Sequence, residues 1–231
     1  MMTIEAAIAE LEKLADEDHR AGLVRYGIPS SNALGVKMPL IRQVAKTIGK
    51  NQSLSEQLWK QNLHEAKHLA AMIADPKLIS EKVVAHWVAD IYSWDICDNL
   101  CDMIAKTSFG LELAYLWCES EPEFVKRCGF VTLTWHVVHN KKAEDEKLLP
   151  FFSLIETQAW DHRNFVKKAV NWLLRQLGKR SLYLHPHAVA CAEKLLDHPD
   201  KSAHWIAKDA LRELNSEAVL ERLRNKAARQ K

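Results

Sequence analysis

Apolar residues recur along almost the whole chain at the spacing of amphipathic helices. The pattern is clear near the start, where one stripe follows i, i+3, i+4, i+7 spacing through Ile4, Ala7, Ile8, Leu11 and Leu14. Similar stripes predict further helices at about 53–60, 63–74, 78–91, 94–106, 109–118, 123–138, 145–159, 163–177, 186–196, 202–214 and 216–228. We find no convincing alternating strand, and the pattern therefore predicts an all-α fold.

Turn-forming residues divide these stripes. Such residues cluster at 27–32, and Pro39 suits the first turn of a helix that runs to Ile48 and ends at Gly49. Further breaks fall at Asp75-Pro76, Glu121-Pro122 and His198-Pro199. Because no low-complexity linker separates the helices, we expect one continuous domain over residues 1–231.

The interior of the chain repeats itself. Residues 123–128 and 164–169 share an aromatic-Val-Lys-basic-small core at an offset of 41, residues 204–208 have a similar outline, and 93–96 are a shorter-spaced relative. A period near 40 with two helices per unit is typical of HEAT and armadillo arrays. This favours a curved right-handed solenoid of antiparallel helix pairs with a concave binding surface, its repeat-bearing core at about 53–214. The alternative is a non-repetitive helical bundle in which two segments are similar by chance.

Composition excludes several classes of protein. Gly and Pro together number 14 of 231 residues, which argues against a turn-rich β-sandwich or barrel, and no glycine-rich phosphate loop is present. No apolar run approaches about 18 residues, and the acidic first segment has no signal-peptide character, so we expect no membrane span. Five cysteines without a Cys-x-x-Cys pair fit reduced thiols in a cytoplasmic protein.

The net charge of +2 conceals an asymmetry between the two halves of the chain. Residues 1–120 hold 12 Lys and Arg against 16 Asp and Glu, a balance of −4. Residues 121–231 hold 20 against 14, a balance of +6. A mildly basic C-terminal half can face a polyanion, although many proteins without a nucleic-acid partner have a similar balance.

Common catalytic and metal-binding patterns are absent from the sequence. None of the 11 histidines forms His-Glu-x-x-His, no Cys/His cluster has structural-zinc spacing, and no serine lies in a Gly-x-Ser-x-Gly elbow. Cys97 and Cys101 are interpreted as buried small hydrophobes, and His185 and His187 as a polar helix start. We therefore do not expect a hydrolase that uses one of these devices.

Tryptophans and charges at the repeat positions remain as candidates for chemistry. Trp94 and Asp98 are i, i+4 and share a helix face, Asp95 lies on the adjoining face, and Ser93 is well placed to cap that helix.

A second stripe holds Lys168, Trp172 and Arg175 at i, i+4, i+7. Two cations and an indole suit a surface that meets phosphates and a sugar or base. The alternative is that both tryptophans pack between helices, the cations are solvated, and Asp98 caps a helix or pairs with Arg127.

These segments together resemble the DNA alkylation repair family, typified by the AlkD alkylpurine DNA glycosylases. The resemblance covers roughly residues 20–214, and its four motifs follow one another in the family's order. The first is the Gly-x-x-x-Pro-x-x-Arg pattern in Leu34-Gly35-Val36-Lys37-Met38-Pro39 with Arg42. The others are Ser93-Trp94-Asp95-Ile96-Cys97-Asp98, Phe124-Val125-Lys126-Arg127 and residues 165–175. AlkD-type members carry two consecutive tryptophans where this chain has Ser93-Trp94. The resemblance implies HEAT-like repeats, in agreement with the period near 40.

The resemblance also implies roles for individual residues. Asp98 corresponds to the family's catalytic carboxylate, Trp94 and Trp172 to the tryptophans that contact the sugar, and Arg127 to an arginine that contacts the DNA backbone. The implied reaction is hydrolysis of the N-glycosidic bond of a cationic alkylated purine, such as 3-methyladenine or 7-methylguanine, in double-stranded DNA. The implied enzyme is a monofunctional, monomeric glycosylase that needs neither a metal nor another cofactor and is nucleoid-associated if bacterial. Further candidates for phosphate contacts, chosen mainly by spacing, are Lys126, Arg163, Lys167, Lys168 and Arg175.

Two other functions fit the same sequence. The family contains members with little or no glycosylase activity, some of which are thought to bind branched or damaged DNA, so a non-catalytic DNA-binding module is an alternative. A protein-binding helical scaffold is a second alternative, because solenoids often bind other proteins. The three differ in base release, in affinity for DNA and in whether the exposed groove is basic or apolar.

Overall fold

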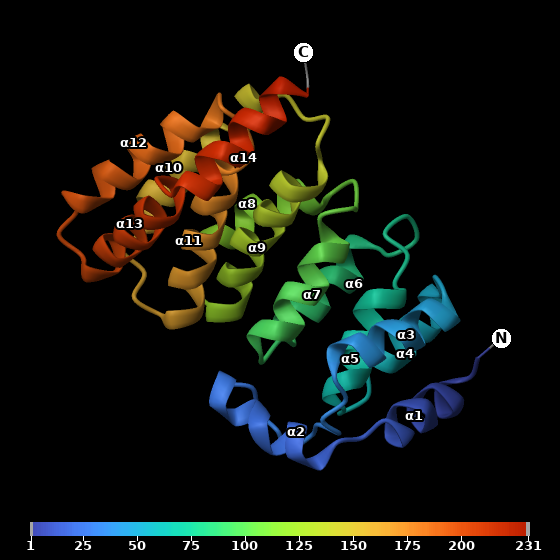
Figure 1. Cartoon of the computed structure of the whole chain (residues 1–231). Helices are drawn as coiled ribbons and strands as arrows, with labels where there is room; N and C mark the ends of the chain where they lie inside the picture. The colour runs from blue at the N-terminus through green and yellow to red at the C-terminus, as the bar shows by residue number, and fades with distance from the viewer. Residues whose placement is uncertain (1, 230–231) are drawn as a thin grey trace. The chain divides into compact units, whose positions relative to one another are not determined.

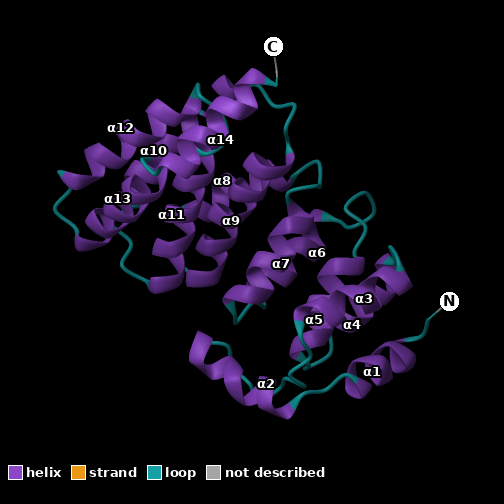
Figure 2. Cartoon of the chain, in the orientation of Figure 1, coloured by secondary structure: helices purple, strands orange, loops and turns teal. Residues whose placement is uncertain are grey.

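The computed structural model describes residues 2–229, and all regular structure among them is helical (Figure 1; Figure 2). The prediction of an all-α fold is therefore confirmed. The chain divides into two compact units, Met1–Gly110 and Leu111–Lys231, and each is described by itself. The expectation of one continuous domain, like that of a curved solenoid, stays a prediction. No helix in the described part of the chain is long and apolar enough to cross a membrane.

The first unit is built around one almost fully buried helix. Its helices are α1 (Ile4–Lys13), α2 (Glu17–Gly22), the 3-10 helix η1 (Leu23–Tyr26), α3 (Met38–Ile48), α4 (Gln52–Trp59), α5 (His64–Ile73), α6 (Glu81–Ala89) and α7 (Trp94–Ile104). Helix α5 packs against α3, α4 and α7, and every residue of α5 except Met72 is buried. Because α5 also carries charged and imidazole groups, these groups must find partners inside the unit.

The second unit stacks helix pairs along the chain. Its helices are α8 (Gly110–Cys118), α9 (Glu123–His139), the 3-10 helix η2 (Asp145–Leu148), α10 (Pro150–Gln158), α11 (Asn164–Gly178), α12 (Leu184–Leu196), α13 (Lys201–Leu214) and α14 (Glu217–Ala228). Helix α11 packs against α9, α12 and α13. Its buried face repeats at i, i+3, i+4, i+7 through Val166, Ala169, Val170, Leu173, Leu174 and Leu177, as the periodicity predicts.

Equivalent positions of neighbouring repeats contact one another in the second unit. The rings of Phe124 and Phe165 stack with centroids 5.6 Å apart. The hydroxyl of Ser202 donates to the carbonyl oxygen of Asp161, 41 positions earlier, at 2.7 Å. These contacts have the separation that the sequence repeat predicts, so the period is also a period of the structure.

Two local features differ from the prediction. Helix α2 begins after Asp16, whose side chain accepts from the backbone N–H of His19, but the helix has no buried residue and so leaves no apolar stripe to detect. The predicted helix over 145–159 is divided into η2 and α10. Pro150 explains the break, because proline has no N–H and is tolerated in the first turn of a helix but not in its interior.

Candidate functional site

The first two turns of α7 carry the predicted pair Trp94 and Asp98, both of intermediate exposure. The indole Nε1 of Trp94 donates to the carbonyl oxygen of Tyr26 at 2.9 Å, and the ring packs on the small apolar cluster of Leu23, Ile28 and Ala33. The indole is therefore fixed by its edge, and the helix places the Asp98 carboxylate one turn further along the same face.

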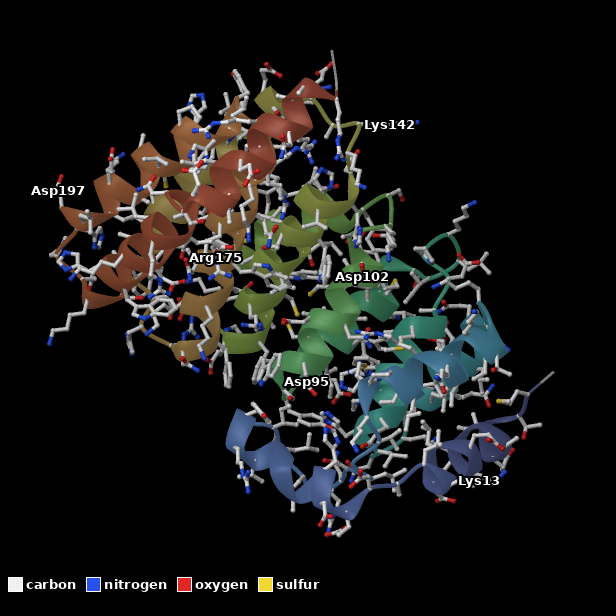
Figure 3. The ribbon with its side chains drawn as sticks, viewed as in Figure 1. Lys13, Asp95, Asp102, Lys142, Arg175 and Asp197 are labelled. Carbon is white, nitrogen blue, oxygen red and sulfur yellow. The ribbon has the colours of Figure 1, made fainter. Side chains whose placement is uncertain are left out.

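Asp95 anchors the start of α7 to α5 (Figure 3). One carboxylate oxygen, Oδ2, lies 2.9 Å from His64 Nε2 and 3.1 Å from His68 Nε2. The other oxygen, Oδ1, accepts from the Ser93 hydroxyl and, at 3.0 Å, from the backbone N–H of Ile96. Ser93 thus occupies the cap position as predicted, but its hydroxyl bonds to Asp95 and makes no hydrogen bond to the backbone of the helix.

Tyr92 and Asn99 contact the other sides of the two imidazoles. Burial raises the pKa of Tyr92 to about 12, and its hydroxyl lies 3.2 Å from His64 Nδ1. The Asn99 amide Nδ2 donates to the His68 carbonyl oxygen at 2.9 Å and lies 3.2 Å from His68 Nδ1. The two Nε2 atoms lie 3.3 Å apart, and both face Asp95.

The hydrogen bonds from the two imidazoles determine the charge state of Asp95. Burial alone would raise the pKa of Asp95, but the hydrogen bonds from His64 and His68 lower it well below its usual range. The partial positive charge at the start of α7 favours the same ionised form. Asp95 is thus an ionised, half-buried carboxylate whose oxygens are both hydrogen-bonded.

His64, His68 and Asp95 also have the spacing of a metal-binding group. If a metal bound the Nε2 atoms, His68 would carry its proton on Nδ1 and donate it to a neighbouring acceptor, as metal-bound imidazoles normally do. That N–H would face the NH₂ group of Asn99, which is also a donor. Rotating the amide by half a turn would instead place its oxygen against the His68 carbonyl oxygen, and two acceptors repel each other. The donor set therefore fits a hydrogen-bonded carboxylate and does not fit a metal ion.

Glu65 of α5 holds the Leu34-Gly35-Val36 segment, which belongs to the Gly-x-x-x-Pro-x-x-Arg pattern. Its buried carboxylate accepts from the backbone N–H groups of Leu34, Gly35 and Val36 at 2.9, 2.7 and 3.2 Å. Gly35 has a φ of +78°, and a Cβ at this position would overlap the carbonyl oxygen of Asp16. Only glycine fits this backbone, which leads into α3.

Replacing Gly35 with alanine is expected to lower the free energy of unfolding by about 2–4 kcal/mol, from the cost of a positive φ and the overlap with backbone. Urea unfolding at neutral pH measures this loss. Gly22→Ala is the matched control, because a Cβ at Gly22 meets nothing within 4 Å and alanine favours the helix. Equal stability of the two variants would contradict the conformational argument.

The second unit carries the other residues of the predicted site. Trp172 of α11 is half-buried and meets the ring of Trp135 edge to face, with centroids 5.5 Å apart. Arg127 is buried near the start of α9, and its Nη1 donates to the carbonyl oxygen of Phe165 at 2.6 Å. The structure brings Trp94 and Asp98 together on α7, whereas the convergence of Asp98 with Trp172 and Arg127 stays a prediction.

Two of the candidate phosphate-binding cations share one buried carboxylate. Lys126 Nζ lies 3.3 Å from Asp161 and 4.9 Å from the centre of the Trp160 ring, and Arg163 Nη2 lies 2.5 Å from the same carboxyl group. Burial would raise the pKa of Asp161, but hydrogen bonds from Arg163 and Lys126 lower it. Both cations thus have partners within the fold, and their phosphate contacts stay predictions.

The remaining three cations differ in how they are engaged. Arg175, which Figure 3 labels on α11, lies 3.0 Å from Asp209. Lys167 lies over the ring of Trp205, 4.8 Å from its centre. Lys168 is exposed, and no acidic group among residues 2–229 lies within ion-pair distance of it. Lys168 is therefore the most accessible of the predicted phosphate contacts.

The sequence did not point to the roles of His64, Glu65 and His68. The only local signal is that α5 has apolar residues on all sides. Polar side chains on such a helix are buried and therefore need partners inside the fold. Those partners are about 30 positions away in the chain, at Asp95 and Gly35. Spacing within one helix gives no access to such pairs.

Comparison with known proteins was made against families, curated sequences and solved structures. The family model for "DNA alkylation repair enzyme" matches residues 7–214. No curated protein matches the chain. Among solved structures, the chain is similar to a protein from "a new family of proteins related to the HEAT-like repeat DNA glycosylases with affinity for branched DNA structures", with 21% identity, a TM-score of 0.78, and coverage of 92% of this chain and 95% of that one. A designed armadillo repeat protein matches with 15% identity, a TM-score of 0.40, and coverage of 91% and 94%.

The fold defined by these helix pairs is that of the HEAT-like repeat proteins related to DNA glycosylases. The chain belongs to the DNA alkylation repair enzyme family. Membership in the family and the HEAT-like fold are therefore confirmed, as the resemblance implied.

Proposed function

We propose that the protein is a DNA glycosylase that hydrolyses the N-glycosidic bond of cationic alkylated purines, such as 3-methyladenine and 7-methylguanine, in duplex DNA. The observation that carries the proposal is the geometry at the start of α7. The contacts of Trp94 with Tyr26 and of Asp95 with His64 fix this helix, which carries Trp94 and Asp98 one turn apart on the same face. Family membership over residues 7–214 supports it.

The proposed chemistry needs only a carboxylate and aromatic faces. An alkylated purine with a positive charge leaves without being protonated, and positive charge then develops on the deoxyribose. An ionised Asp98 directed at that sugar would stabilise the charge and orient the attacking water. The indole faces of Trp94 and Trp172 would hold the cationic sugar by cation–π contacts of about 0.5–2 kcal/mol each.

Release of the free base tests the proposal directly. The purified chain, in excess over a duplex carrying 7-methylguanine, is expected to release the methylated base with single-exponential kinetics, measured by chromatography of the free base. An otherwise identical duplex with guanine should release nothing. If neither 7-methylguanine nor 3-methyladenine is released above the rate without protein, the chain is not a glycosylase of this class.

A non-catalytic DNA-binding module is the second candidate, and one position favours it. AlkD-type glycosylases carry a tryptophan where this chain has Ser93, and here Ser93 is buried and bonded to Asp95. The structurally similar protein comes from a family with affinity for branched DNA. This candidate expects tighter binding to a four-way junction than to a linear duplex of equal length, together with no base release.

Replacing Trp172 with leucine is expected to slow release of 7-methylguanine by roughly 3- to 30-fold, since one cation–π contact to the sugar is lost. The measurement is the single-turnover rate at saturating protein, which separates the chemical step from binding. Trp160→Leu is the matched control, because Trp160 is a partly exposed indole over Lys126 without a proposed contact to the sugar. Equal rates for the two variants would remove Trp172 from the mechanism.

A further inference from the structure

The second unit contains a pocket of about 580 Å³ that none of the proposed catalytic residues lines. It lies where the end of α9, the loop that follows it, the end of α11 and one face of α14 meet. Its volume is in the range of small-molecule sites, about 300–1,000 Å³. The family model ends at residue 214, so α14 contributes its side chains from outside the matched region.

Arg180 lines this pocket, and each nitrogen of its guanidinium makes at least one hydrogen bond. Its guanidinium pairs with Asp145 at 2.8 Å and donates to the carbonyl oxygens of Val137, Asn140 and Ala143 at 2.6, 3.0 and 2.8 Å. The carbonyl groups that follow α9, which would otherwise repel an anion, are thereby neutralised.

Four further cations line the pocket: Lys179 after α11, Lys141 in the loop, and Arg222 and Lys226 on α14. Lys179 pairs with Glu213 at 2.7 Å, whereas no acidic group in the described part of the chain lies within ion-pair distance of the other three. Lys226 donates one hydrogen bond, to the carbonyl oxygen of Arg180, which leaves two ammonium protons for another acceptor. Glu146 is the one lining acid that no cation pairs with. The pocket therefore has more positive than negative charge.

The cations repel one another in the absence of an anion. Partial burial lowers the pKa of Lys226, and the positive charges of Arg180, Arg222 and Lys141 lower it further against the opposing effect of Asp145. A phosphate group placed among them would relieve this repulsion and accept several charge-assisted hydrogen bonds.

We propose that this pocket binds phosphate groups, and that in the DNA complex it holds phosphates of the DNA backbone. The second half of the statement rests on the proposed function, whereas the first half does not. The exposed side chains of Lys141 and Arg222 allow a charge-removing test that leaves the ion pairs of the fold in place.

The test compares two double variants of the full chain with equal charge loss from the same two segments. The pocket variant is Lys141→Ala with Arg222→Ala. The control is Lys142→Ala with Arg224→Ala, because neither Lys142 (Figure 3) nor Arg224 lines the pocket. Fluorescence anisotropy with a labelled, undamaged duplex of about 20 base pairs is recorded over about 50–200 mM NaCl.

The pocket variant is expected to bind this duplex roughly 10- to 60-fold more weakly at about 100 mM salt, with a log–log salt slope shallower by about 1.8, while the control stays within about twofold of wild type. A second arm measures thermal unfolding in inorganic phosphate against chloride at equal ionic strength. Phosphate should raise the Tm of wild type and control but not that of the pocket variant.

The two arms separate the source of the phosphate. Lost duplex affinity assigns DNA phosphates to the pocket, and a lost phosphate effect with unchanged duplex affinity assigns a small phosphorylated compound. If pocket variant and control behave alike in both arms, the proposal is wrong. The single-turnover rate of base release at saturating protein should be equal in all three proteins. If wild type releases no base, the glycosylase proposal is refuted and the phosphate-binding proposal is not.

Discussion

Asp98→Asn is expected to slow release of 7-methylguanine from duplex DNA by roughly 100- to 1,000-fold at saturating protein. Asparagine keeps the size and shape of the side chain but removes the negative charge that the proposed mechanism places against the oxocarbenium-like sugar. The half-buried setting of Asp98 on α7 strengthens the effect, because charges interact more strongly where water is partly excluded.

The measurement is the single-turnover rate, combined with the affinity for an undamaged duplex. Duplex affinity should be unchanged or slightly tighter, because one negative charge near a polyanion has been removed. Asp102→Asn is the matched control, since Asp102 lies one turn further along α7 and pairs with Lys106 at 2.8 Å. Equal rates for Asp98→Asn and wild type would show that the carboxylate takes no part in the reaction.

Much of the fold could be predicted from sequence because its signals are local and repeated. The buried stripe of α11 and the recurring aromatic-Val-Lys core each lie within a few turns of helix, and their period is the separation at which Phe124 and Phe165 stack. Helix α2 lacked such a signal, since none of its six residues is buried.

The candidate site could be predicted only in part, because its supporting contacts are not local. The i, i+4 spacing of Trp94 and Asp98 is a property of one helix and is present in the structure. By contrast, a basic residue on a helix gives no sign of its partner. Lys126 was selected as a phosphate contact, and the structure places its ammonium group against Asp161 inside the second unit.

The same reasoning explains why the sequence indicates for Asp95 only its place on the helix face next to that of Trp94 and Asp98. Its neighbours in sequence suggest an ordinary acid in the first turn of a helix, which the helix dipole would favour. Its two imidazole partners, His64 and His68, lie on α5, and they in turn contact Tyr92 and Asn99. The position of Trp94 and Asp98 therefore depends on a network that only the tertiary structure reveals.

Asp95→Asn is expected to lower the free energy of unfolding by about 3 kcal/mol at neutral pH. An amide has no negative charge and only one acceptor oxygen, so it cannot keep both the hydrogen bond from the Ile96 N–H and the contacts of a carboxylate oxygen with His64 and His68. Urea unfolding measures the loss. Asp18→Asn, an exposed change without an ion pair, is the control and should stay within about 0.5 kcal/mol of wild type.

The loss caused by Asp95→Asn should shrink in acid. The hydrogen bonds of the folded state hold the pKa of Asp95 below its usual value of 3.8, against the opposing effect of burial. A lowered folded-state pKa contributes stability that is complete above the unfolded-state pKa and is lost as the pH falls towards the folded-state value. The gap between wild type and Asp95→Asn should thus narrow by roughly 1 kcal/mol between about pH 5 and about pH 3. A gap that widened within this window would contradict a lowered pKa of Asp95 in the folded protein.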